Sequence, residues 1–197
     1  MKSGKWTYDT ASSICLRSPQ GLRRGEIGAL QFEDIDLNRK SIRIIRSMTE
    51  YTGVGHTELG IKNGTKNGKA RTTILPTVLR PVLEEYLQTV KPTPWKDSEG
   101  RVWHPLFMNP KTSLPYTLSS FTQHWDRTRD KWLEQGILKR KVTLHGLRKS
   151  FITYLGNGKH VPDDIIAEMV GHSNPTITHQ IYIKTGHQDI ERVDINL

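Results

Sequence analysis

Several stretches of the chain carry apolar residues at the three- and four-residue spacing of an amphipathic helix. Residues 76–90 place six such side chains on one face, namely Val78, Val82, Leu83, Tyr86, Leu87 and Val90. Residues 118–134 direct three bulky aromatic side chains inward, Phe121, Trp125 and Trp132. A shorter helix is expected over residues 26–30, because Ile27 and Leu30 would share one face.

The C-terminal third of the chain predicts three more helices. Residues 144–155 form the first of them. Pro162 suits the first position of the second helix, and Gly171 suits the residue just past its end. The third helix begins at Asn174-Pro175, which fit a cap and a first turn. This last helix carries Ile177, Ile181 and Tyr182.

Strand signals are confined to the first half of the chain. Residues 41–46 and 71–75 are rich in β-branched residues and predict strands. The polar stretch 34–38 predicts a turn, and Asn-Gly pairs between the two strands are further turn signals. We therefore expect a mainly α fold with one small antiparallel sheet of about three strands, and with Lys66 on its hairpin turn.

Composition narrows the class of partner. The 197 residues fit one domain, or one domain plus a tail. A formal net charge of +9 favours a polyanionic partner, either nucleic acid or an anionic membrane. Two runs contribute five basic residues each without an acid, between Leu59 and Pro81 and from Leu138 to Ser150. Each run alone is also typical of a solvated loop, but both contain or adjoin candidate site residues.

The remaining composition argues for a reducing compartment. Cys15 is the only cysteine, so no internal disulfide and no cysteine-rich metal site can form. No apolar stretch approaches the ~20 residues of a membrane span, and the N-terminus lacks the apolar run of a signal peptide. We expect a cytoplasmic protein with no membrane partner.

Two segments place arginines where they can bind a phosphate. Guanidinium groups stay ionised and can hold two phosphate oxygens through parallel hydrogen bonds. Arg23 lies in Gly-Leu-Arg-Arg-Gly-Glu, and Glu26 three positions later could buttress it on a helix. His145 and Arg148 are also three apart, so both can face one phosphate. Taken alone, each motif is more typical of a solvent-facing helix surface.

Three further residues complete a set suited to attack on a phosphodiester without a metal. Lys66 could protonate a leaving oxygen if neighbouring cations lower its pKa, although Lys62 and Lys69 are close rivals. His172 follows Gly171 and could aim at a neighbouring site or simply cap a helix. Tyr182 lies ten residues later. A phenol becomes a nucleophile when a base or nearby cations favour its phenolate.

These four separated motifs resemble the catalytic domain of tyrosine recombinases, the phage-integrase family, from about residue 21 to about residue 185. The matching segments are Gly-Leu-Arg-x-x-Glu, a hairpin lysine, His-x-Leu-Arg, and Gly-His-Ser followed by a tyrosine. Gln20 and Lys184 depart from the residues that are common in the family, at positions peripheral to the chemistry. Lys149 stands where histidine is frequent in the family and retains a basic group there. The resemblance implies the DNA breaking-rejoining fold and no metal or other cofactor.

The resemblance also implies a reaction in which the tyrosine forms a 3′-phosphotyrosyl bond and a DNA strand is later rejoined. In this reaction, the resemblance implies that Tyr182 is the nucleophile and that Lys66 is the general acid. It implies that His145 assists proton transfer. The residues that it implies as stabilisers of the phosphate oxygens are Arg23, Arg148 and His172. Basic residues expected to contact DNA are Lys69, Arg71, Lys139, Arg140, Lys141 and Lys149.

For domain organisation, we expect a catalytic domain over residues 1–185 and a C-terminal tail over residues 186–197 that packs on a neighbouring subunit. Only about 20 residues precede Arg23. That is too few for the helical DNA-clamping domain which the family usually places first, so we expect a fragment of a bacterial or phage protein. The expected partner is double-stranded DNA at specific recombination sites, with a monomer alone and a tetramer on paired sites.

The favoured function is site-specific recombination, for integration or excision of a mobile element. Two other classes stay open. A type IB topoisomerase would use the same reaction to relax DNA, although the compact spacing and the Gly-His-Ser motif argue against it. A non-catalytic DNA-binding module would bind DNA in a salt-sensitive way but form no covalent product.

Overall fold

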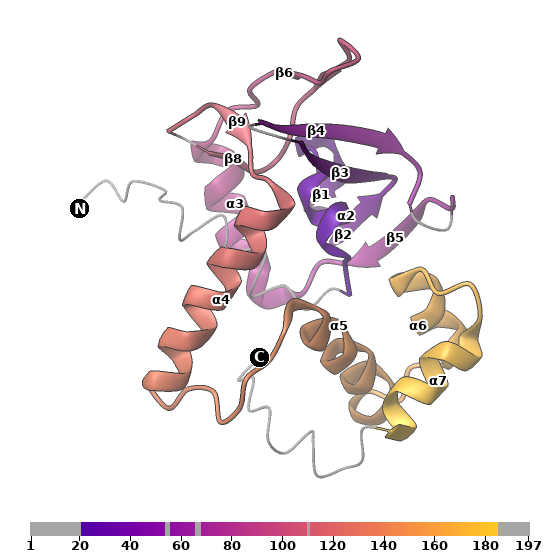
Figure 1. Ribbon diagram of the computed structural model, residues 1–197. Coiled ribbons are helices and arrows are strands. Elements are labelled where there is room, and N and C mark those ends of the chain that lie inside the picture. Colours follow the sequence, from indigo (N-terminus) through magenta and orange to yellow (C-terminus); the bar gives the residue numbers. More distant parts are fainter. Residues whose placement is uncertain (1–20, 54–55, 66–67, 110, 185–197) are drawn as a thin grey trace.

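The computed structural model describes residues 21–53, 56–65, 68–109 and 111–184. In this part of the chain the helices are mostly longer than the strands, and Figure 1 shows how the two are arranged. The helices, in chain order, are α2 (Arg24–Gly28), α3 (Arg80–Thr89), α4 (Leu118–Glu134), α5 (Leu144–Thr153), α6 (Asp163–Val170) and α7 (Pro175–Lys184), with short 3₁₀ turns η1 (Phe32–Asp34) and η2 (Thr77–Leu79) and a π turn η3 (Tyr154–Gly158).

The strands form one three-stranded sheet and three separate hairpins. The sheet has the order β1-β2-β5 and is antiparallel throughout. Its strands are β1 (Ile35–Asp36), β2 (Ser41–Ile44) and β5 (Arg71–Ile74). The hairpins pair β3 (Arg46–Gly53) with β4 (His56–Asn63), β6 (Trp95–Lys96) with β7 (Val102–Trp103), and β8 (Met108–Asn109) with β9 (Leu114–Pro115).

The expected three-stranded sheet is present, but one of its strands is not where the sequence predicts it. Residues 34–38 do not form a simple turn, because Ile35 pairs with Ile42 and Asp36 with Ser41 before the chain turns. The stretch 41–46 is also interrupted, since β2 ends at Ile44 and a second strand begins at Arg46. The long β3–β4 hairpin that follows has no counterpart in the prediction.

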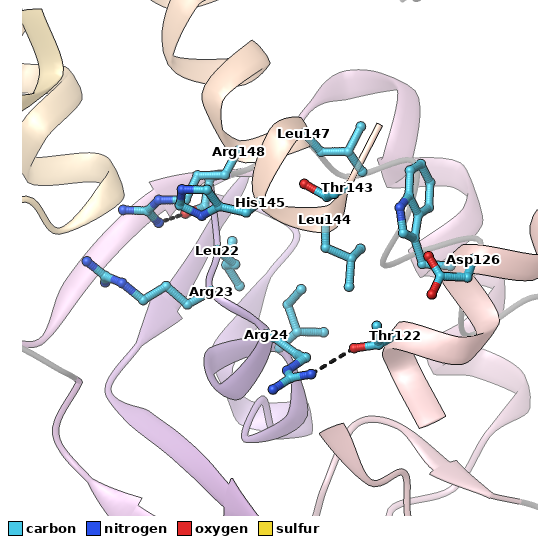
Figure 2. Close-up of a pocket in the computed structure, with 13 residues that line it drawn as sticks. Leu22, Arg23, Arg24, Thr122, Asp126, Thr143, Leu144, His145, Leu147 and Arg148 are labelled. Carbon is cyan, nitrogen blue, oxygen red and sulfur yellow. Dashed lines mark hydrogen bonds between the residues drawn. The ribbon is translucent and has the colours of Figure 1, made fainter. Parts of the chain in front are cut away.

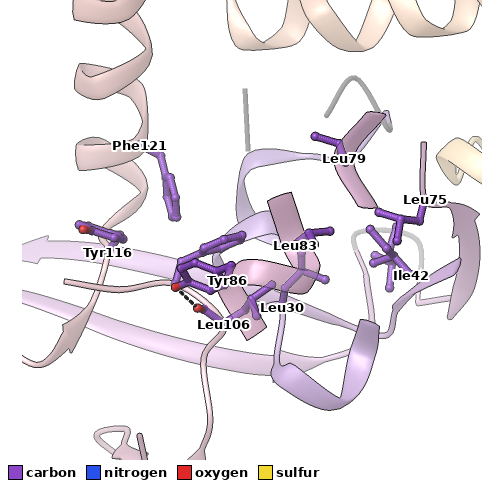
Figure 3. Packing of buried hydrophobic residues seen from close by; sticks show 11 residues of the cluster. Leu30, Ile42, Leu75, Leu79, Leu83, Tyr86, Leu106, Tyr116 and Phe121 are labelled. Carbon is purple, nitrogen blue, oxygen red and sulfur yellow. Dashed lines mark hydrogen bonds between the residues drawn. The ribbon is translucent and has the colours of Figure 1, made fainter. Parts of the chain in front are cut away.

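The main hydrophobic core lies between the sheet, α3 and the start of α4 (Figure 3). Leu83 and Tyr86 of α3 are buried in one cluster with Ile42 of β2 and Leu75, the residue after β5. The Tyr86 hydroxyl donates a hydrogen bond to the Leu106 carbonyl, 2.7 Å away, so the core accommodates this polar group with a partner. The predicted apolar face of residues 76–90 is confirmed for Val82, Leu83, Tyr86, Leu87 and Val90, which all join this core. Its first turn is 3₁₀ rather than α, and the side chain of Val78 lies outside the described part of the structure.

A separate cluster joins α5, α6 and α7 into a C-terminal helical module, drawn brown to yellow in Figure 1. Phe151, Ile152, Ile166 and Val170 form its buried centre, and Ile181 of α7 packs against them. Gly171 ends α6 at φ +69°, as its position predicted. Pro162 is the residue before α6 rather than its first helical residue. The module borders the sheet where α6 approaches β5.

The predicted bounds of α4 are confirmed, with Phe121 and Trp125 buried and Trp132 partly buried. Trp125 donates its indole N–H to the Val142 carbonyl at 2.8 Å, which fixes the segment leading into α5. α7 begins as predicted, because the Asn174 side chain accepts from Thr176 N at 2.9 Å. None of the helices within the described residues is both long and apolar enough to cross a bilayer.

Candidate active site

Glu26 organises the arginines at the start of α2. Its carboxylate is 1% exposed and accepts hydrogen bonds from Arg23 N at 2.7 Å and from Arg23 Nη1 at 2.9 Å. The buttress predicted from the three-residue spacing is therefore confirmed. The same carboxylate accepts a bidentate pair from Arg71, at 2.9 and 2.6 Å. Burial raises the pKa of Glu26, but Arg71 and Arg23 together outweigh burial, so its pKa lies below the ordinary value and it stays ionised.

Three consecutive backbone carbonyls at the end of α6 each accept a hydrogen bond from a different arginine. Arg71 Nε donates to Met169 O at 2.9 Å, Arg148 Nη2 to Val170 O at 2.5 Å, and Arg23 Nη2 to Gly171 O at 3.0 Å. The carboxyl end of a helix carries partial negative charge, which favours cations there. This helix end thus gathers three guanidinium groups that would otherwise repel one another.

Arg148 is the more deeply placed of the two predicted phosphate-binding arginines. Its side chain is buried and also donates to the carbonyl of Gly21. Burial, with the charge of Arg23 nearby, lowers the pKa of Arg148 to about 10, so the guanidinium remains cationic at neutral pH. Arg23 keeps 27% of its side chain exposed. The two arginines therefore approach one place from α2 and α5.

A pocket of about 430 Å³ lies beside these arginines, between α2, α4 and the start of α5 (Figure 2). Arg23, His145 and Arg148 line one side of it, and Figure 2 shows their side chains grouped there. On the other side Arg24 donates to the Thr122 hydroxyl at 2.8 Å. A phosphate bound in this pocket could contact Arg23, His145 and Arg148.

His145 is exposed and surrounded by cations. Partial burial, and the charges of Lys149, Arg148 and Arg23, lower its pKa below the ordinary value of about 6.5. A neutral imidazole at pH 7 can accept a proton. His145 can therefore act as a base in the DNA-free site.

His172 belongs to the same cluster, although it lies in the short connection between α6 and α7. Burial, followed by the charges of Arg148, Arg23 and Arg71, lowers its pKa to about 4. Its Nδ1 is 2.9 Å from the hydroxyl oxygen of Thr178, a buried residue of α7. The predicted histidine is thus neutral at pH 7, and one ring nitrogen is held by the helix that carries Tyr182.

The two remaining predicted residues are described only in part or not at all. The backbone of Tyr182 belongs to α7, which packs on both α5 and α6, but its side chain lies outside the described residues. Lys66 also lies outside them, in the loop between β4 and β5. The roles predicted for Tyr182 and Lys66 stay predictions. The C-terminal tail, residues 186–197, is likewise outside the described part of the chain.

The basic residues predicted to contact DNA divide into two groups. Five of them are exposed, at the β4–β5 loop, in the α4–α5 connection and on α5: Lys69, Lys139, Arg140, Lys141 and Lys149. Arg71 differs, because only 4% of its side chain is exposed and Glu26 and Met169 occupy its donors. The prediction that Arg71 contacts DNA is not supported, since a buried guanidinium that is paired with Glu26 offers DNA almost no surface.

The sequence did contain a signal for this burial. In the strand Arg71-Thr72-Thr73-Ile74 buried and exposed positions alternate, and Arg71 shares the inward face with Thr73. The alternation of a strand therefore placed Arg71 inside, where an arginine requires a carboxylate partner. As for metals, no group of three or more His, Cys, Asp or Glu suitable for holding an ion occurs among the described residues.

The chain belongs to the phage integrase family, whose sequence profile matches residues 2–189. A XerC-like tyrosine recombinase from Caldanaerobacter subterraneus subsp. tengcongensis is 29% identical over 178 residues, covering 82% of this chain and 42% of the relative. The prophage integrase IntR of Escherichia coli is 26% identical over 177 residues, covering 82% and 40%. The chain thus spans less than half the length of these curated relatives.

The fold is also that of solved recombinases. The Tn1549 transposon integrase, in complex with a circular intermediate DNA, superposes with a TM-score of 0.73 over 96% of this chain and 60% of that chain, at 22% identity. The resemblance inferred from four motifs is therefore confirmed for the family and for the fold, a tyrosine recombinase catalytic domain.

Proposed function

We propose that this chain carries the catalytic site of a site-specific DNA recombinase that works through a covalent phosphotyrosyl intermediate on Tyr182. The observation that carries the proposal is the convergence of Arg23, Arg148, His145 and His172 at the end of α6, next to the helix that bears the tyrosine. Family membership and the relatives named as recombinases and integrases support the same chemistry.

In the proposed first step, the phenol oxygen of Tyr182 attacks the phosphorus of one DNA strand. A P–O bond to the tyrosine forms as the bond to the 5′-oxygen breaks, and the electron pair leaves with that oxygen. His145 accepts the phenol proton, and Lys66 gives a proton to the 5′-oxygen. Strand joining reverses these transfers with a 5′-hydroxyl from another duplex.

The arginines and His172 supply the electrostatic part of the reaction. Charge builds up on the phosphate oxygens in the transition state, and fixed donors aimed at those oxygens stabilise it. Arg23 and Arg148 together retain N–H groups beyond those bound to carbonyls, because each guanidinium has five. A bound phosphate would also favour the protonated form of His172, which then donates to an oxygen.

The DNA partner would cover the exposed basic residues around this site. Lys139, Arg140 and Lys141 precede α5, and Lys149 lies on it, so they flank His145 along one segment. We propose double-stranded DNA at specific recombination sites as the substrate and the movement of a mobile element as the biological setting. We further propose a monomer in solution that assembles to a tetramer on paired sites.

A trapping experiment tests this function with no assumption about the target sequence. A library of nicked duplexes with a randomised core is incubated with the chain, and the nick lets the short 5′-hydroxyl strand diffuse away after cleavage. A recombinase yields protein bound covalently to a recurring sequence on a denaturing gel. If no sequence gives such an adduct, while salt-sensitive DNA binding is retained, the chain is a binding module and the proposal is wrong.

The topoisomerase alternative is separated by a second measurement. A type IB topoisomerase relaxes supercoiled plasmid that lacks a partner site, whereas a recombinase requires its own sequence. We expect no relaxation of a plasmid lacking the selected sequence. Efficient relaxation of that plasmid would favour the topoisomerase class.

A further inference from the structure

Arg71 makes the most extensive set of contacts of any arginine around the site, although no step of the proposed reaction uses it. It opens β5, and its guanidinium joins two parts of the fold that lie far apart in the sequence. One side makes the bidentate pair with Glu26, at 2.9 and 2.6 Å, and the Nε atom donates to Met169 O at 2.9 Å. Arg71 therefore links α2, the sheet and the end of α6.

Gly171 lies directly on this guanidinium. A Cβ atom built at Gly171 would be 2.9 Å from Arg71 Nη1 and 3.0 Å from Arg71 Cζ, closer than side-chain carbons normally approach. The residue also needs its φ of +69° to end α6, a conformation that glycine adopts without strain. Two constraints thus require glycine here, and one of them is contact with Arg71. The residue directly after Gly171 is His172, one of the predicted site residues.

The contacts of Arg71 bear on three groups of the proposed active site at once. Glu26 is shared between Arg71 and Arg23, so the position of one guanidinium depends on the other. On the far side, the carbonyls of residues 170 and 171 hold Arg148 and Arg23. A shift of the α6 end would therefore disturb His172 and both arginines, and misplacement by about 1 Å can cost ~10²-fold in rate.

We propose that Arg71 is a positioning residue for strand cleavage, which sets the end of α6 and thereby aims His172 and the helix of Tyr182 at the scissile phosphate. This inference rests on the proposed function. It assigns Arg71 no contact with DNA. Positioning requires the planar geometry of the Arg71 guanidinium as well as its charge, because three N–H donors in fixed directions bind Glu26 and the Met169 carbonyl at the same time.

A rival role exists for the same residue. Arg71 closes the β4–β5 loop, in which Lys66 is the predicted general acid, so it could act by anchoring that lysine. The two roles differ in their dependence on the leaving group. A 5′-bridging phosphorothiolate leaves as a thiolate and needs no proton, so this substrate restores cleavage only when the defect lies in the general acid.

The test compares Arg71→Lys with the unmodified chain on the sequence selected by trapping. Single-turnover formation of the covalent adduct is measured at saturating DNA, with non-covalent affinity measured separately in the Tyr182→Phe background. We expect Arg71→Lys to reduce the cleavage rate by about 10²-fold and to change the affinity by less than about 3-fold. The phosphorothiolate substrate is expected to leave this loss in place.

Arg46→Lys serves as the matched control. Arg46 also pairs with a buried carboxylate, Asp34, at 2.8 Å, and 13% of its side chain is exposed, but its contacts do not include α6. It should lose stability without a comparable loss of cleavage rate. Urea unfolding of each variant shows that the rates come from folded protein.

Each outcome is decisive for Arg71. A wild-type cleavage rate in Arg71→Lys, restoration by the phosphorothiolate, or an equal loss in Arg46→Lys would overturn the inference. Gly171→Ala provides an independent measurement, because its methyl group would push against the Arg71 guanidinium, and it should reproduce the loss of rate. If the unmodified chain forms no adduct at all, the proposed function fails, which is a distinguishable result.

Discussion

Replacing Glu26 with glutamine tests the electrostatic centre of the site. The carboxylate is 1% exposed and accepts four hydrogen bonds, two from Arg23 and two from Arg71. Glutamine retains the shape but removes the charge and turns an –NH₂ group toward one of the arginine donors. Breaking a buried ion pair on one side typically costs about 3–5 kcal/mol, because the remaining charge is left uncompensated.

The free energy of unfolding is measured by urea titration at pH 7, followed through tryptophan fluorescence. We expect Glu26→Gln to lose about 3–5 kcal/mol, which corresponds to a lowering of Tm by roughly 6–20 °C for a chain of this size. Glu84→Gln is the control, since Glu84 pairs with Arg80 at the surface, with side chains 37% and 39% exposed, and should lose under about 0.5 kcal/mol. A loss below about 1 kcal/mol in Glu26→Gln would refute the reasoning.

Three further predictions concern other residues in and around the site. Arg148→Lys keeps the charge but loses the planar fork, so covalent adduct formation should slow by at least ~10²-fold in single-turnover assays. His172 has a folded-state pKa of about 4, below its unfolded value. Its contribution to the free energy of unfolding is therefore full above pH ~6.5 and is lost as the pH falls toward 4. In urea titrations at a series of pH values, His172→Asn should flatten this part of the stability profile. If the five exposed basic residues each neutralise one phosphate, DNA affinity should fall ~500-fold between 50 and 200 mM salt. Lys141→Ala should reduce the slope of log affinity against log salt concentration by about 1, whereas the control Lys91→Ala should leave it unchanged.

Most helices of this fold could be predicted from the sequence, because each has a wide apolar face that packs on a core. The faces on α3 and α4 are examples, and Gly171 marked the end of α6 without ambiguity. The β3–β4 hairpin could not be predicted in this way. Met48 and Ile61 are its buried apolar residues while much of its remaining surface is exposed, so the alternation typical of a strand is weak.

Within the site, sequence spacing was sufficient where the partners lie in one helix or at its N-cap. Arg23 with Glu26, and His145 with Arg148, are three residues apart, and the structure places each pair accordingly. It was insufficient for Arg71, whose partner Glu26 lies 45 residues earlier in the chain. An arginine in a basic run favours a DNA contact on charge alone. The alternation of β5 indicates that Arg71 faces inward, but only the tertiary structure shows which carboxylate it pairs with. The carbonyls of α6 that bind three arginines are equally invisible in a sequence.

The central claim, that Tyr182 is the nucleophile, is tested most directly by its phenylalanine variant. Tyr182→Phe removes one hydroxyl, so non-covalent DNA affinity and the urea unfolding curve should be nearly unchanged. On nicked DNA of the selected sequence, the unmodified chain should give a protease-sensitive adduct on a denaturing gel. Mass spectrometry should map the attached nucleotide to Tyr182. The phenylalanine variant should give no adduct. An adduct formed by Tyr182→Phe, or one mapped to a different residue, would contradict the account.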